Sequence, residues 1–210
     1  MCAALWTQKL REGLPGSVAA APSAGGTAPR ALADGRAAPA PSGGALAYSS
    51  CASPFGTVRL AATVDGICAV SLYETEAAFR GRLAAARGDA LDAAPLLAQA
   101  ATELAEYFAG RRQGFGVPLD LTAATPFDRR VLAAIAAIPY GTTRTYGELA
   151  RALGSPGAAR AVGHACGRNP VPLLIACHRV LRSDGSLAGF GAGGPTVKAD
   201  SVPKSCWWER

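Results

Sequence analysis

The chain has 210 residues, half of them hydrophobic, and a formal net charge of +6, so it can bury a core in one ordinary domain or two small ones. No apolar run of about 18 residues is unbroken, which argues against a membrane-spanning helix. The apolar stretch near the N-terminus precedes Lys9 and Arg11, the reverse of signal-peptide order, so we expect a cytoplasmic protein with no membrane partner.

The positive charge lies in the C-terminal part of the chain. Residues 1–125 carry 10 Lys/Arg and 10 Asp/Glu, whereas residues 126–210 carry 11 Lys/Arg and 5 Asp/Glu. Such one-sided charge suits a polyanionic partner, although a solubilising surface would have the same composition. The arginines that dominate this excess are Arg129, Arg130, Arg144, Arg151, Arg160, Arg168, Arg179 and Arg182.

The chain begins with a segment of low complexity. Residues 1–45 are rich in Ala, Pro, Gly and Ser without periodicity, which predicts a disordered leader. After it, residues 57–63 alternate in polarity, Asp65-Gly66 follows, and residues 67–72 are mostly apolar. This pattern predicts a β-hairpin with a tight turn.

A helix is expected next. Residues 93–109 place their apolar side chains on one helical face, and Gly110 ends the pattern. The segment 46–122 is therefore expected to be a small α/β domain in which helices pack on a sheet.

The segment 123–198 has a helical pattern. Thr125 supplies an N-cap, followed by a proline at the first helical position and an acid at the third. Thr145 to Glu148 form a second capping box, which opens a short helix ending at Leu153. Ser155-Pro156 opens a third helix over residues 158–166. Short helices joined by tight turns in the basic part of the chain are typical of a helix-turn-helix, although an ordinary helical core has the same periodicity.

The six cysteines, at positions 2, 51, 68, 166, 177 and 206, form no CxxC pair. In a reducing cytosol most of them are expected to be inert buried thiols. The set His164, Cys166, Cys177 and His178 fits the spacing of no common zinc module, so we expect no bound metal.

Three short motifs at fixed separations are far more specific than any one of them alone. They are Ala-Arg-Ala-Val-Gly at 159–163, the Asn169-Pro170 step, and Cys-His-Arg-Val at 177–180. In this combination the chain resembles the O6-alkylguanine-DNA alkyltransferases, also called methylated-DNA–protein-cysteine methyltransferases, from about Ser53 to Lys198. The resemblance implies an α/β (α+β) fold. It comprises a small ribonuclease-H-like sheet-and-helix domain and a winged helix-turn-helix-like domain that binds DNA.

The chemistry of that family explains Cys177 and His178. Displacing an alkyl group from the O6 oxygen of guanine requires a soft, strong nucleophile, and a thiolate is the best that a protein has. A free thiol with a pKa of about 8.5 is mostly protonated at neutral pH and needs a base. By resemblance, His178 acts as that base through a water. The thioether formed is stable, so we expect one irreversible turnover by a monomer, without a cofactor.

The target atom is hidden inside duplex DNA, so the nucleotide must be flipped out. By resemblance, Arg160 fills the vacated place in the base stack, and Tyr146 rotates the nucleotide and hydrogen-bonds the guanine. Asn169 is the hinge between the recognition helix and the cysteine loop. Small residues let that helix approach the groove. The further DNA-binding residues are Ala159, Gly163 and Arg179.

The sequence departs from the family at several positions. Ala176 replaces the proline before the cysteine, and Phe190 replaces a tyrosine over the guanine site. In the divergent tail, 199–210, Ser205 takes the place of a glutamate that orients the histidine. Pro203 would interrupt the closing helix, and Glu209 comes four residues too late.

Three alternatives to an active alkyltransferase remain. The damaged tail favours a non-catalytic alkylated-DNA lesion-binding protein with weakened transfer, whereas Cys177 argues against it. A transcriptional regulator would leave the Cys-His-Arg-Val motif unexplained. A cysteine hydrolase would need a third catalytic residue near His178, and the sequence shows none. The range of alkyl groups, and whether O4-alkylthymine is a substrate, stay open.

Overall fold

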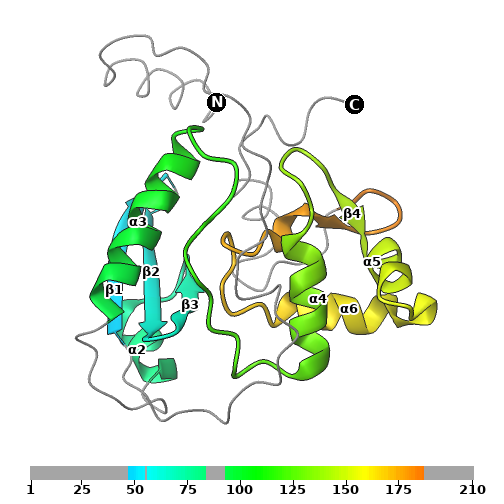
Figure 1. Cartoon of the computed structure of the whole chain (residues 1–210), viewed down its shortest axis with the longest axis horizontal. Coiled ribbons are helices and arrows are strands. Elements are labelled where there is room, and N and C mark those ends of the chain that lie inside the picture. Colours follow the sequence, from blue (N-terminus) through cyan, green and yellow to red (C-terminus); the bar gives the residue numbers. More distant parts are fainter. Residues whose placement is uncertain (1–46, 55, 84–92, 187–210) are drawn as a thin grey trace.

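A computed structural model describes residues 47–54, 56–83 and 93–186, which form two units lying side by side (Figure 1). The N-terminal unit contains β1 (Ala47–Ser53), β2 (Gly56–Thr63), β3 (Gly66–Ser71), α2 (Glu76–Leu83) and α3 (Ala94–Phe108). The C-terminal unit contains α4 (Pro126–Ala136), β4 (Arg144–Thr145), α5 (Tyr146–Ala152), η3 (Pro156–Ala158), α6 (Ala159–Gly167), η4 (Cys177–Arg179) and β5 (Val180–Leu181). None of these helices is long and apolar enough to span a membrane.

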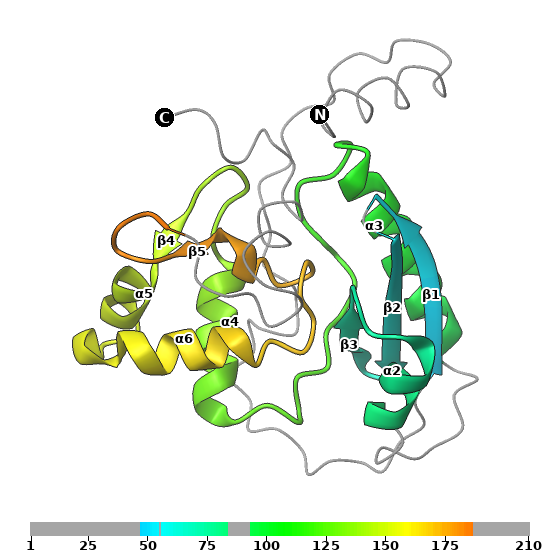
Figure 2. The same ribbon diagram turned by 180° about the vertical axis from the view of Figure 1, so that it is seen from behind.

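The N-terminal unit is built on an antiparallel sheet in the order β1-β2-β3. The predicted hairpin is confirmed, since β2 pairs with β3 from Thr63 opposite Gly66 to Arg59 opposite Ser71. Alternate side chains of the sheet enter two separate cores. Leu60 packs in the core that includes α3, whereas Ala61 packs against Phe79 of α2. The two helices therefore cover opposite faces of the sheet, as Figure 2 shows.

Helix caps define the C-terminal unit. The hydroxyl of Thr125 accepts a hydrogen bond of 3.1 Å from the amide of Asp128, which confirms the predicted cap of α4. The capping box of α5 is also confirmed: the amide of Glu148 donates to Thr145 Oγ1 at 3.1 Å, and the Glu148 carboxylate accepts from the amide of Thr145 at 2.6 Å. The third helix begins one residue later than predicted, because Ala158 completes a preceding 3-10 turn.

The two units are joined through the edge strand β3. The amide of Ile67 donates to the carbonyl of Pro118 at 2.9 Å, so the connecting segment runs along this edge. Gly66 permits the approach, because a Cβ at this position would lie 2.7 Å from the Pro118 backbone. Farther along β3, the amide of Val70 donates to the carbonyl of Pro170 at 2.8 Å. The sheet therefore holds the loop that leads to Cys177.

Several expectations fall outside the described residues. They concern the leader over residues 1–45 and the departures at Phe190, Pro203, Ser205 and Glu209.

Candidate active site

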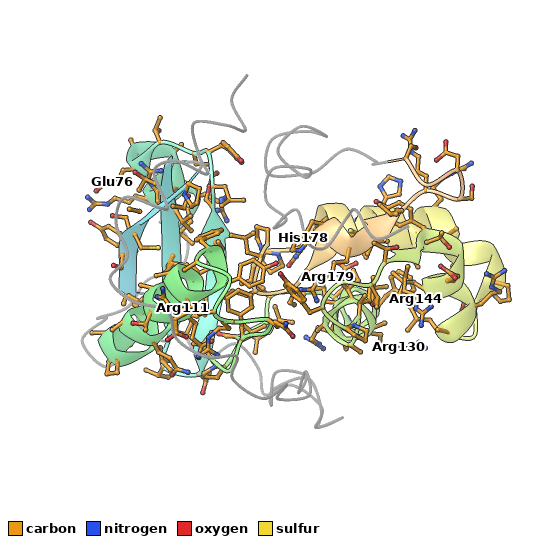
Figure 3. All side chains as sticks on the ribbon, turned by 90° about the horizontal axis from the view of Figure 1, so that it is seen from above. Glu76, Arg111, Arg130, Arg144, His178 and Arg179 are labelled. Atoms are coloured by element: carbon orange, nitrogen blue, oxygen red, sulfur yellow. The ribbon has the colours of Figure 1, made fainter. Side chains whose placement is uncertain are left out.

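Cys177 lies at the start of the short 3-10 turn η4, close to the N-terminal unit. The side chains of Cys177 and His178 are buried, with 2% and 0% exposed. Figure 3 shows His178 between the two units. The amide of Cys177 donates to the carbonyl of Ile175 at 2.8 Å, so the backbone around the nucleophile is held in a tight turn. Ala176 has φ −75°, a value that proline would impose, so the missing proline leaves the backbone direction unchanged here.

Asn169 holds the loop between α6 and Cys177. Its side-chain amide donates to the carbonyl of Ile175 at 3.0 Å, and its side-chain oxygen accepts from the amide of Val171 at 3.1 Å. The loop also contains Leu173 at φ +74°, a left-handed conformation that is strained for a branched side chain. These two hydrogen bonds fix the course of the loop between α6 and Cys177.

Tyr146 is the first residue of α5, directly after the Thr145 cap. Its ring lies over α6, where a Cβ added to Gly163 would be 3.8 Å from ring carbons. Burial raises the pKa of the Tyr146 hydroxyl, with further contributions from Cys166 and Cys177. Tyr146 therefore stays protonated, a donor close to the thiol of Cys177.

Cys166 was not predicted to belong to the site. It is 8% exposed, and its thiol donates to the carbonyl oxygen of Cys177 across 3.8 Å. Spacing along the chain offered no signal, because the contact depends on how α6 packs on the cysteine loop. The four residues considered above as zinc ligands form no metal-binding group among the described residues.

The outer surface of the helical unit carries unneutralised arginines. Arg160, near the start of α6, is exposed, and Ala159 beside it is half-buried. Within the described ranges, no carboxylate forms an ion pair with the exposed arginines of this surface. They are Arg144, Arg151, Arg160 and Arg182.

Arg179, which the resemblance places among the DNA-binding residues, is almost fully enclosed by the protein. Its side chain is only 7% exposed, donates to the carbonyl of Ile138 at 2.9 Å and lies over the ring of Tyr140 at 5.3 Å. The guanidinium is therefore buried in the interior, between η4 and the end of α4. Figure 3 shows Arg179 near His178, whereas Arg130 and Arg144 lie farther from the N-terminal unit.

Arg168 forms an ion pair with a carboxylate of the same unit. It donates to Asp128 through Nε at 3.1 Å and through Nη2 at 2.6 Å. The hydrogen bond from Arg168, and a smaller contribution from Thr125, lower the pKa of the Asp128 carboxyl despite its burial. This bidentate pair ties the start of α4 to the end of α6, one residue before Asn169. Part of the positive charge counted in the sequence is therefore neutralised within the fold.

Comparison with known proteins identifies both units. Residues 46–121 match "6-O-methylguanine DNA methyltransferase, ribonuclease-like domain", and residues 126–202 match "6-O-methylguanine DNA methyltransferase, DNA binding domain". The chain is 50% identical over 96 residues to a methylated-DNA–protein-cysteine methyltransferase of Mycobacterium leprae, covering 46% of this chain and 58% of that one. It therefore spans less than two thirds of that mycobacterial relative.

Other relatives match over more of their length. The methylated-DNA–protein-cysteine methyltransferase of Methanosarcina acetivorans is 36% identical over 147 residues, which cover 70% of this chain and 90% of the archaeal one. The crystal structure of Mycobacterium tuberculosis OGT in complex with DNA has a TM-score of 0.62 and 35% identity, covering 75% of this chain and 96% of that chain. The chain belongs to the 6-O-methylguanine DNA methyltransferase family, with a ribonuclease-like sheet domain followed by a helical DNA-binding domain.

Proposed function

We propose that this protein repairs O6-alkylguanine in double-stranded DNA by moving the alkyl group onto its own Cys177 in a single turnover. The observation that carries the proposal is the position of Cys177. It lies in a constrained buried turn, beside His178 and within electrostatic reach of the Tyr146 hydroxyl, on the helical unit whose outer surface bears free arginines.

The reaction balances without a cofactor. His178 takes the thiol proton, and the thiolate sulfur attacks the alkyl carbon, forming a C–S bond as the C–O6 bond breaks. The electron pair of the broken bond stays with guanine, which takes up one proton to become neutral, and His178 releases the proton that it took from the thiol, so no net proton is gained or lost. In this proposal Tyr146, which stays protonated, donates a hydrogen bond to the base as this charge develops. Since the thioether is not cleaved again, each molecule acts once.

DNA binding is proposed from the same surface. Arg160 is exposed on α6, and Arg144, Arg151 and Arg182 are exposed on the same helical unit without carboxylate partners among the described residues. A similar protein from M. tuberculosis has been crystallised with DNA. Each phosphate that these arginines neutralise should add about −0.9 to the slope of log affinity against log salt.

The test is stoichiometric uptake of labelled methyl from duplex DNA that contains O6-methylguanine. Wild-type protein should accept one methyl per molecule, Cys177→Ala none, and Cys68→Ala, which removes a half-buried thiol of β3, should behave as wild type. Cys177→Ala should still bind the duplex. Full uptake by Cys177→Ala would overturn the assignment, and binding without uptake by the wild type would instead support a non-catalytic lesion-binding protein.

A further inference from the structure

A second thiol contacts the backbone of the nucleophile. Cys166 lies on the inner side of α6, and its Sγ donates to the carbonyl oxygen of Cys177 at 3.8 Å. Both residues are buried, at 8% and 2% exposed, so this contact is shielded from bulk water. Helix α6 is thereby connected directly to η4, the turn that carries the sulfur of Cys177.

The same thiol acts on Tyr146. Interaction with Cys166 raises the pKa of the Tyr146 hydroxyl, in the same direction as the larger effect of burial. The Tyr146 ring lies against α6 at Gly163, almost one helical turn before Cys166, where a Cβ would be 3.8 Å from the ring carbons. The Tyr146 ring thus lies over α6 at Gly163, and the hydroxyl is within electrostatic reach of Cys166.

We infer that Cys166 is a positioning residue for alkyl transfer, because its thiol holds the Tyr146 hydroxyl and the Cys177 carbonyl in one arrangement. This inference rests on the proposed function and adds a residue to it. A thiol is both a weak donor and a weak acceptor. The Cys166 thiol can therefore orient the Tyr146 hydroxyl in the free protein, and the weak bond between them can break when a guanine binds the same hydroxyl.

A packing role makes a different prediction. A buried cysteine commonly behaves as a small hydrophobic residue, and truncating one to alanine then changes stability without regard to a neighbour's hydroxyl. If Cys166 acts through the Tyr146 hydroxyl, removing that hydroxyl first should abolish the effect of removing the thiol. A double-mutant cycle separates the two roles.

The experiment measures single-turnover alkyl transfer from free O6-methylguanine base to the full-length protein. The variants are Cys166→Ala, Cys166→Ser, Tyr146→Phe and the double variant Cys166→Ala/Tyr146→Phe, with Cys68→Ala as the control. Cys166→Ala should slow transfer about three- to tenfold, the loss expected for one neutral hydrogen bond. Cys166→Ser, which keeps a donor and an acceptor, should stay within roughly twofold of wild type on the same energy scale.

In the Tyr146→Phe background, Cys166→Ala should cause no further loss. If Cys166→Ala fails to fold, Cys166→Val, which fills the space without a polar atom, replaces it in the cycle. Wild-type rates for Cys166→Ala, or losses that multiply independently in the double variant, would overturn this inference while leaving methyl uptake at Cys177 intact. A wild-type protein that takes up no alkyl group would overturn the proposed function itself.

Discussion

The hinge at Asn169 gives the sharpest structural prediction. Asn169→Ala removes two hydrogen bonds, one to the carbonyl of Ile175 at 3.0 Å and one from the amide of Val171 at 3.1 Å. Val171 and Ile175 are fully buried, so water does not readily replace the lost partner. At about 1–2 kcal/mol for each group left unsatisfied, the unfolding free energy should fall by about 2–4 kcal/mol.

That loss is measurable in two ways. In a chain of this size it corresponds to a decrease of roughly 5–15 °C in Tm. Alkyl transfer should also slow on free O6-alkylguanine as well as on duplex DNA, because the loop that Asn169 fixes carries Cys177 and not the outer surface of α6. The assays are thermal unfolding and single-turnover transfer on both substrates.

A matched control removes an amide hydrogen bond elsewhere. Gln99 donates to Glu103 at 2.9 Å on α3, in the N-terminal unit, so Gln99→Ala should leave the transfer rate unchanged. If Asn169→Ala unfolded at the wild-type temperature and transferred alkyl groups at the wild-type rate, the hinge role would be refuted.

Three further predictions follow from charged residues. Arg160→Ala should slow repair in duplex DNA much more than reaction with the free base, because only the duplex requires a flipped nucleotide to be stabilised; equal losses would exclude this role. Arg179→Met should lower Tm through the lost bond to Ile138 while the salt dependence of DNA affinity stays the same, and a smaller salt slope would place Arg179 at the DNA after all. Asp128→Asn should lower Tm at neutral pH. The pKa of Asp128 is lowered in the fold, so its contribution is present above the unfolded carboxyl pKa of about 3.9 and lost as pH falls through the folded value. The Tm gap between wild type and Asp128→Asn should therefore close in acid, and a constant gap would contradict the assignment.

The sequence was sufficient to predict features that are formed by residues close together in the chain. The hairpin turn at Asp65-Gly66 and the caps at Thr125 and Thr145 depend on residues within three or four positions of each other, and all were predicted. Strand β1 was missed because its segment is rich in Ala and Ser and lacks apolar alternation. It becomes a strand by pairing with β2. Helix α2 was missed because it is short and buries only Phe79.

In the candidate site, the sequence indicated the residues of the contiguous motif but not the contacts that depend on tertiary packing. Cys177, His178 and Asn169 could be proposed from the sequence because their motif is contiguous or nearly so along the chain. The burial of Arg179 was not found, because composition counts a charge without showing whether a carbonyl and an aromatic ring enclose it. Cys166 was expected to be an inert thiol, since its contact with Cys177 depends on the packing of α6 against a loop that begins three residues later.

Helix α6 connects the DNA contact proposed at Arg160 with the acceptor sulfur proposed at Cys177. Cys166 lies six positions after Arg160, and at about 100° per residue the two side chains point to different sides of the helix, roughly 120° apart. Arg160 is exposed, while the thiol of Cys166 bonds to the carbonyl of Cys177. Truncating the outer residue should spare chemistry on a free base, whereas truncating the inner one should impair it. If Arg160→Ala slowed alkyl transfer from duplex DNA and from the free base equally, the substitution would have to shift α6 as a whole. We would then expect the shift to displace Cys177 through the Cys166 contact. In the Cys166→Ala background, Arg160→Ala should therefore slow transfer from the free base less.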